Sequence, residues 1–125
     1  MKNKFMDMYY WLDYIVDQEG ISIQHKINSG HEKRVGRYFV DGYSAECNTV
    51  FEYHGCYHHG HQCYLTRHIK DEKQVKAQEA KQKRPQAREK FLKRCGYNVV
   101  SIYECDYKKW IEPNIAKVRD RYLPP

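Results

Sequence analysis

Apolar residues recur at helical spacing near the start of the chain, between about Phe5 and Asp17. The apolar positions of this segment are Met8, Tyr9, Trp11, Leu12, Ile15 and Val16. Their spacing predicts an amphipathic helix, and Gly20 is a suitable residue to end it. Aspartates interrupt the apolar run, so the segment is neither a signal peptide nor a membrane span.

Alternation of polar and apolar residues then predicts strands. Ile21–His25 forms a short alternating run, and Asn28–His31 is a turn. Lys33–Tyr43 predicts a longer strand, Ser44–Asn48 a polar turn, and Thr49–His54 the returning partner strand. The last two strands would form a hairpin.

The second half of the chain predicts helix, strand and helix. Lys70–Arg94 is highly charged and mostly helical, and Pro85 either kinks it or begins a second helix. Its later part carries an expected buried stripe formed by Ala87, Phe91 and Cys95. Tyr97–Tyr103 predicts an inner strand, and Trp110–Tyr122 a closing helix. This order indicates one α/β domain over residues 1–125, with a mixed sheet flanked by helices.

The charge balance favours an anionic partner. The chain has a net charge of +6 and 12 tyrosines, a composition that suits nucleic acid better than a membrane surface. The alternative is that the charge only keeps a small domain in solution. Basic residues crowd one predicted helical region: Lys81, Lys83, Arg84, Arg88, Lys90, Lys93 and Arg94. Together they could neutralise phosphates, although each one alone could belong to a solvated helix face.

A stretch of unusual composition runs from position 50 to position 63. It contains one acidic residue, four histidines and two cysteines. Cys56, His61 and Cys63 have C-x4-H-x-C spacing, and Cys105 follows the last predicted strand. Structural zinc prefers four Cys and His ligands in a tetrahedron, so we expect these four residues to bind one zinc ion.

Two alternatives to this zinc site stay open. His58 or His59 could replace His61 as a ligand, or the cysteines could be buried thiols without a metal. The chain has five cysteines and no secretory signal, which favours reduced thiols and a metal over disulfides. We therefore expect an intracellular protein.

Acidic residues and histidines suggest a second site. Asp41 and Glu52 can face each other across the predicted hairpin, and Glu52 and His54 share a strand face. Carboxylate oxygens bind Mg²⁺, and a histidine beside them can take a proton from water. The pattern suggests phosphodiester cleavage, with His59 assisting the leaving group. Alternatively, Asp41 is a plain turn residue and Glu52 pairs with a lysine.

Two sequence blocks resemble the very-short-patch mismatch repair endonucleases. The first block, HGCYHHGHQCYL, begins at His54, and the second, GYNVVSIYEC, ends at Cys105. With Asp41, the resemblance spans about residues 37–106. It implies a restriction-endonuclease-like fold and Mg²⁺-dependent nicking of one DNA strand beside a T·G mismatch.

The resemblance also implies roles for individual residues. Asp41 would bind the catalytic metal, and His54 and His59 would be catalytic. The implied zinc ligands are Cys56, His61, Cys63 and Cys105. The repair family wedges aromatic side chains of this loop into the DNA stack, and Tyr57 occupies one such position. His58 stands where the family has a tryptophan, which argues against T·G specificity.

A second departure points to a wider group. Glu52 has no acidic counterpart in the repair enzymes, but with Asp41 it fits the PD-(D/E)xK nuclease pattern, with a histidine in the lysine position. This combination is similar to nuclease-like domains attached to polymerases of mobile elements and large viruses, in which Glu32 would be a further acid. The repair family also has an acidic residue on its first helix, for which Asp7 and Asp13 are both candidates.

The sequence thus predicts a Mg²⁺-dependent DNA endonuclease, a nickase acting on mismatched or branched duplex DNA, with one structural zinc. The expected DNA contacts are Tyr57, His58, Lys81, Lys83, Arg84 and Arg88. We expect a monomeric domain that works with DNA inside the cell, in the nucleus if the host is eukaryotic. The alternative is a catalytically inactive, zinc-stabilised DNA-binding module of a larger polymerase or transposase. A third interpretation, catalysis at the zinc itself, is disfavoured because four protein ligands leave no open position.

Overall fold

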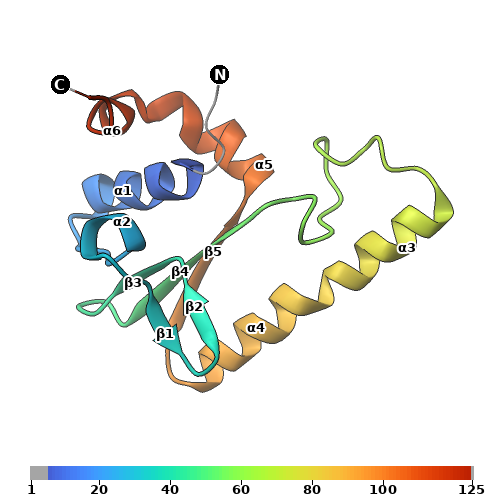
Figure 1. Cartoon of the computed structure of the whole chain (residues 1–125), viewed down its shortest axis with the longest axis horizontal. Coiled ribbons are helices and arrows are strands. Elements are labelled where there is room, and N and C mark those ends of the chain that lie inside the picture. Colours follow the sequence, from blue (N-terminus) through green and yellow to red (C-terminus); the bar gives the residue numbers. More distant parts are fainter. Residues whose placement is uncertain (1–5, 125) are drawn as a thin grey trace.

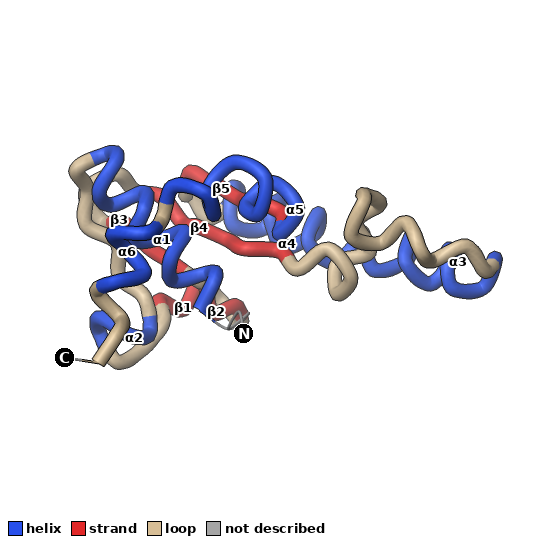
Figure 2. Tube along the Cα trace, turned by 90° about the horizontal axis from the view of Figure 1, so that it is seen from above, coloured by secondary structure: helices blue, strands red, loops and turns tan. Residues whose placement is uncertain are grey.

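The computed structural model describes residues 6–124 and shows a small sheet with helices on both sides (Figures 1 and 2). The larger elements are α1 (Asp7–Glu19), β1 (Lys33–Val35), β2 (Tyr38–Val40), β3 (Gly42–Ser44), β4 (Thr49–His54), α3 (Glu72–Lys81), α4 (Lys83–Arg94) and β5 (Asn98–Tyr103). The short helices are α2 (Lys26–Ser29), α5 (Glu104–Asp106), the π-helix η2 (Tyr107–Ile111), the 3-10 helix η3 (Glu112–Asn114) and α6 (Ala116–Asp120). The mixed α/β class is confirmed. None of the helices within residues 6–124 has the length and apolarity that a membrane crossing requires.

The main sheet has the order β3-β4-β5. β3 and β4 form the predicted antiparallel hairpin, whereas β4 and β5 run parallel, with His54 opposite Tyr103. β4 is the buried central strand, and β5 lies at the sheet edge with half of its residues exposed. The prediction of an inner strand over Tyr97–Tyr103 was therefore wrong. Its apolar residues indicated burial on both sides, but it has a partner strand on one side only.

The predicted strand over Lys33–Tyr43 is broken into three pieces. A turn at Gly36 separates β1 from β2, which pair as an antiparallel hairpin in a second, two-stranded sheet. Gly36 has a φ of +60°, and a Cβ there would lie 2.6 Å from the Phe91 ring. Glycine therefore both permits the turn and allows the hairpin to approach α4. The predicted strand over Ile21–His25 is reduced to one bridge, between Gln24 and Tyr43.

Two hydrophobic clusters lie on opposite faces of β4, because successive side chains of a strand alternate. Phe51 points to a cluster with Trp11 and Leu12 of α1 and with Ile115 and Val118 near the C-terminus. Val50 points to the other cluster, which contains Val35, Val40 and Leu92. Glu52 and His54 are two and four residues after Val50, so their side chains lie on the same face of β4 as Val50, the face that α4 covers.

The charged region after the loop forms two helices that run almost in line (Figure 1). Pro85 is buried in the first turn of α4, so it belongs to the start of a second helix and not to a kink. The expected buried stripe was wrong, because Ala87 and Cys95 are exposed. The buried residues of α4 are Pro85 and Leu92, seven positions apart. The predicted closing helix is instead a series of three short segments, η2, η3 and α6.

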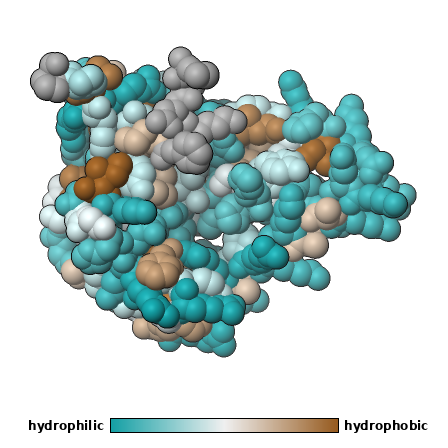
Figure 3. Space-filling view, in the orientation of Figure 1, coloured by the Kyte–Doolittle hydropathy of each residue, from teal (hydrophilic) through white to brown (hydrophobic). Residues whose placement is uncertain are grey.

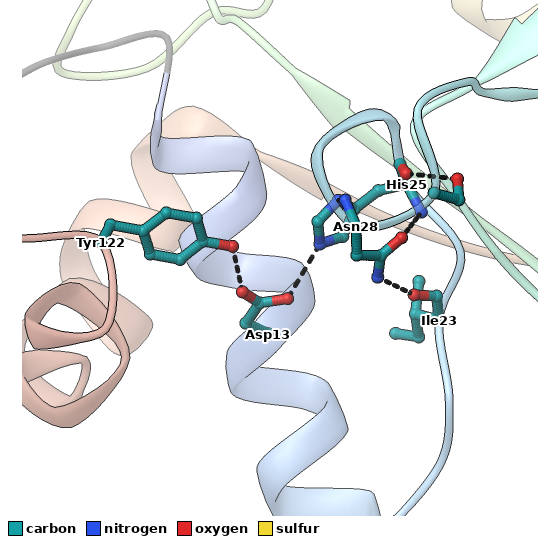
Figure 4. Close-up of polar contacts among 6 residues, drawn as sticks. Asp13, Ile23, His25, Asn28 and Tyr122 are labelled. Carbon is teal, nitrogen blue, oxygen red and sulfur yellow. Dashed lines mark hydrogen bonds and ion pairs between the residues drawn. The ribbon is translucent and has the colours of Figure 1, made fainter.

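A buried polar network joins α1 to both the following turn and the C-terminal segment (Figure 4). Asp13 accepts hydrogen bonds from the Tyr122 hydroxyl and from His25 Nε2, the latter at 3.0 Å. His25 Nδ1 accepts from the Asn28 backbone N–H at 3.2 Å, which leaves the ring proton on Nε2. Asn28 in turn donates to the Ile23 carbonyl at 2.6 Å. Asp13 thus has a structural position in this fold.

Replacing Asp13 with alanine is expected to lower the free energy of unfolding by about 2 kcal/mol, because it leaves the buried His25 ring without its acceptor. Burial opposes ionisation of Asp13, but the hydrogen bonds from His25 and Tyr122 outweigh it and hold its pKa below the usual range. Ionised Asp13 therefore contributes its full stabilisation to the free energy of unfolding at pH values above the ordinary aspartate pKa. This stabilisation is lost as the pH falls through the lower pKa of the folded state.

Denaturant unfolding at neutral and acidic pH measures this effect. Asp17→Ala is the matched control, since Asp17 lies on the same helix and pairs with Arg121 near the surface. Loss of that exposed pair should change stability by less than about 1 kcal/mol. Equal effects of the two substitutions would contradict the structural role of Asp13.

Candidate metal centre and active site

Four side chains converge at the end of the sheet in an arrangement that could hold a metal ion such as zinc. The ligand atoms of Cys56, His61, Cys63 and Cys105 all lie within 4.8 Å of one another. His61 Nδ1 lies 3.5 Å from Cys56 Sγ and 3.5 Å from Cys105 Sγ. All four residues were predicted as ligands, and His61, not its neighbouring histidines, joins the cysteines.

The parallel pairing of β4 with β5 explains why residues so far apart in the sequence meet. His54 lies opposite Tyr103 at the ends of the two strands, and a cysteine follows two residues after each strand ends, Cys56 after β4 and Cys105 after β5. The Cys105 backbone N–H donates to Cys56 Sγ at 3.3 Å, and the Cys56 N–H donates to a Glu104 carboxylate oxygen at 3.2 Å. Burial raises the pKa of the Cys56 thiol, so a metal ion would have to displace its proton.

The loop is folded by its own hydrogen bonds. Thr66 Oγ1 donates to the His61 carbonyl at 2.7 Å and accepts from the Cys63 N–H at 3.1 Å. The His61 ring stacks on Tyr103, with centroids 3.9 Å apart and an interplanar angle of 15°. These contacts orient two of the ligands. Sequence reasoning did not single out Thr66, because a lone threonine in a loop carries no metal-binding signal.

The carboxylates of Asp41 and Glu52 lie close together, as the predicted hairpin implied. Asp41 precedes β3 and accepts a hydrogen bond from the Tyr53 backbone N–H at 2.7 Å, next to Glu52 on β4. Burial and the charge of Glu52 raise the pKa of Asp41 to about 7. Glu32 acts electrostatically on both carboxylates, so three acids share one region.

One of these acids has a partner that the sequence did not predict. Arg88 of α4 donates through Nε and Nη2 to the two carboxylate oxygens of Glu52, the Nη2 bond being 3.1 Å long. Arg88 Nη2 also donates to the Phe39 carbonyl at 2.6 Å. Burial raises the pKa of Glu52, and Arg88 opposes that shift. A lysine partner was the alternative considered from the sequence, and the actual partner is an arginine.

The two candidate catalytic histidines lie side by side. The His54 and His59 rings have centroids 4.7 Å apart, in an edge-to-face arrangement. Burial, and then the positive potential of His59 and Arg88, lower the pKa of His54 to about 4. His54 is therefore a neutral hydrogen-bond acceptor and donor at neutral pH.

A cavity of about 120 Å³ is lined by two of the candidate catalytic residues, Glu52 and His54, whereas Asp41 and His59 are not among its lining residues. Glu52 and His54 line one side, Arg88 of α4 another, and Ser101 and Tyr103 of β5 the third. Asp7, a candidate acid on the first helix, lies elsewhere. It interacts with Tyr107 and Tyr53, and alternation along β4 places Tyr53 on the opposite face of the sheet from Glu52.

The basic residues predicted to contact DNA fall into two groups. Lys83 and Arg84 are exposed on the largely hydrophilic surface of α4, and Lys81 lies with its Nζ 4.2 Å from the Tyr57 ring centroid (Figure 3). His58 is exposed beside Tyr57. Arg88 differs, because Glu52 and the Phe39 carbonyl occupy its guanidinium.

The pattern of residues thus gives two adjoining sites, a Cys/His cluster and a carboxylate–histidine cavity. Neither a family model nor a curated protein matches this chain.

Proposed function

We propose that this chain is a Mg²⁺-dependent DNA endonuclease that nicks mismatched or branched duplex DNA. The observation that carries the proposal is that Asp41 lies close to Glu52, which shares a face of β4 with His54, two residues before the first cysteine of the Cys/His cluster. A restriction-endonuclease-like fold is part of the proposal, since the carboxylates lie on a central strand with a parallel strand beside it.

Zinc is the ion proposed for the Cys/His cluster. Tetrahedral Zn–S and Zn–N bonds of about 2.3 and 2.0 Å separate sulfur from nitrogen by about 3.5 Å. His61 Nδ1 lies at that distance from both Cys56 and Cys105. Three cysteines and one histidine complete the coordination, so the zinc would be structural and would leave hydrolysis to the carboxylates.

Asp41 and Glu52 are the proposed Mg²⁺ ligands. The donor set fits the ion, because hard cations prefer carboxylate oxygens and three acids share this region with the Arg88 guanidinium. When bound, Mg²⁺ would polarise the scissile phosphate and lower the pKa of a bound water. Glu52 would help to hold the ion, and Arg88, which binds both of its carboxylate oxygens, positions the carboxylate.

His54 is the proposed general base. Its depressed pKa keeps the imidazole neutral, so a ring nitrogen can accept the proton of the attacking water. Burial and the potential of His58 also lower the pKa of His59, whose ring contacts that of His54. His59 can therefore hydrogen-bond the phosphate or the leaving oxygen without carrying a permanent charge.

Cleavage of supercoiled plasmid and of labelled duplexes tests the proposal. The zinc-loaded protein is assayed with and without Mg²⁺ on fully paired, mismatched and branched DNA. We expect Mg²⁺-dependent nicking, and the preferred duplex distinguishes mismatch from branch processing. Salt-sensitive DNA binding without any cleavage would instead establish the inactive DNA-binding module.

Asp41→Asn is expected to stabilise the Mg²⁺-free protein at pH about 8 by on the order of 2 kcal/mol. The folded-state pKa of Asp41, about 7, lies above its ordinary value. The folded protein therefore binds more protons than the unfolded chain between the two values, and wild-type stability falls as the pH rises. The advantage of the variant should be smaller near pH 5 and should vanish only below the ordinary aspartate pKa of about 4, where the group is protonated in both the folded and the unfolded state.

Urea unfolding at the two pH values, without and with excess Mg²⁺, measures this. Asparagine keeps an acceptor for the Tyr53 N–H. Added Mg²⁺ should stabilise only the wild type, since ligand binding to the folded state adds to its stability. A variant that is no more stable than wild type at pH 8 would show that Asp41 bears no unfavourable charge.

Tyr57→Ala should weaken binding to distorted DNA about tenfold, and binding to regular duplex much less. Tyr57 is 53% exposed on the loop beside the active site, where its ring can stack on an unpaired base. Fluorescence anisotropy with bulged and fully paired duplexes at one salt concentration measures both affinities. An equal loss on the two duplexes would remove the stacking role.

A further inference from the structure

A second cavity lies between the loop after β4 and helix α3, and the proposed chemistry does not use it. It encloses about 220 Å³, and its lining includes Tyr57, Ile69, Ala77, Gln78 and Lys81. This is smaller than the roughly 300–1,000 Å³ of pockets for drug-sized ligands. Its occupant is therefore limited to about one ring system, and the lining offers an aromatic face, apolar walls and an amide.

Gln78 is the unusual residue of this lining. Its side chain is buried, with 5% exposure, and neither its amide nitrogen nor its amide oxygen has a hydrogen-bond partner within residues 6–124. Buried polar groups are almost always paired, because an unpaired amide has lost its water without compensation. Within the described part of the chain, the amide of Gln78 thus has two N–H donors and a carbonyl acceptor unused at the cavity wall, and because other atoms cover them, the side chain would turn about its rotatable bonds to reach a ligand.

The walls of the cavity are held in place by backbone contacts. Gly60 lies so close to α3 that a Cβ there would be 1.8 Å from the Gln78 carbonyl oxygen. Gln82 Nε2 donates to the Gly60 carbonyl at 2.7 Å, which ties the loop to the end of α3. Because loop and helix are fixed at this point, the cavity is preformed.

We propose that this cavity binds one unstacked nucleobase of the DNA. A glutamine amide is complementary to the adjacent donor and acceptor on a base edge. Tyr57 supplies a stacking surface, and Lys81, beside the Tyr57 ring, supplies a cation for a flanking phosphate. The inference rests on the proposed function in taking DNA as substrate, and it narrows the substrate to duplexes with at least one unpaired base.

Equilibrium binding without Mg²⁺, so that no strand is cut, tests the proposal. The wild type is titrated with a duplex carrying a single-nucleotide bulge and with the same bulge lacking its base. We expect the base-bearing bulge to bind about tenfold more tightly, the effect of one stacked base. Gln78→Met, which removes the amide, and Ala77→Leu, which narrows the cavity, should bring this ratio close to one.

Ala80→Leu is the matched control. It makes the same change as Ala77→Leu at another exposed position of α3, away from the cavity lining, and should keep the tenfold ratio. Gln78→Met should melt no lower than the wild type, because a thioether replaces an unpaired buried amide.

A ratio of one in the wild type, or a wild-type ratio in both Gln78→Met and Ala77→Leu, would overturn the proposal. The Gln78 amide would then be satisfied by water, for which an adjoining cavity of about 30 Å³ has room. The two proposals fail separately. Nicking without base preference removes only the base pocket, and base preference without Mg²⁺-dependent nicking removes only the nuclease.

Discussion

Replacing Cys105 with serine is expected to abolish binding of the proposed zinc ion and to unfold the domain. Cys105 brings the end of β5 to the loop that carries the other three ligands. Structural zinc sites contribute about 10–16 kcal/mol of apparent binding free energy. The net stability of a small domain is only about 5–15 kcal/mol. When the loss of one ligand releases the ion, the free energy removed is comparable to the whole net stability of the domain, so the domain is expected to unfold.

The measurement combines metal analysis of the purified protein with circular dichroism. Cys95→Ser is the matched control, because Cys95 is an exposed thiol that follows α4 and takes no part in the cluster. It should bind one zinc per chain and melt as the wild type does. A folded, fully zinc-loaded Cys105→Ser protein would refute the four-ligand site.

Replacing Asp41 with alanine is expected to reduce Mg²⁺-dependent nicking by roughly 10³-fold, since a catalytic metal supplies several kcal/mol of transition-state stabilisation. Among residues 6–124 Asp41 forms no ion pair, whereas Glu52 is paired with Arg88. Without Asp41, the remaining carboxylate would have to hold the ion while bound to an arginine. Single-turnover nicking of a preferred duplex, at saturating protein, isolates this loss from any change in DNA affinity.

Two comparisons make the result specific. Asp120→Ala removes an exposed acid at the end of α6 and should nick at the wild-type rate. The zinc content and DNA affinity of Asp41→Ala should equal those of the wild type. Undiminished nicking by Asp41→Ala would show that the carboxylate–histidine cavity is not the site of cleavage.

The metal cluster could be predicted because its signal is largely local in the sequence. The C-x4-H-x-C spacing places three ligands in one loop, and Cys105 ends a recognisable strand. The Glu52–Arg88 pair could not be predicted in this way. It depends on how α4 crosses β4, between residues 36 positions apart, and one of many basic residues had to be chosen. The high density of basic residues predicts a basic helix, but it does not indicate which arginine side chain points toward the sheet.

Strand boundaries failed for a similar reason. Lys33–Tyr43 looks continuous in its polarity, yet Gly36 supplies a left-handed turn that allows the hairpin to pack on Phe91. The cavity beside Gln78 also escaped prediction, since a glutamine in a charged helix gives no sign of burial. Periodicity identifies elements, whereas contacts between distant elements decide where they break and which polar groups they enclose.

The alternation along β4 ties the chemistry of this protein to its core in a way that limits how the strand can evolve. Each residue serves either the apolar cluster around Phe51 or the face that carries Glu52 and His54. Inserting or deleting one residue within β4 would exchange the two faces, burying the carboxylate among apolar side chains and turning Phe51 toward the cavity that Glu52 and His54 line. Insertions and deletions of single residues should therefore not be tolerated in β4. The turn at residues 45–48 is exposed, but it forms hydrogen bonds with neighbouring segments, from Glu46, Cys47 and Asn48 to Ser22, Gly96 and Asn98. A length change there should cost those contacts without exchanging the faces of the strand.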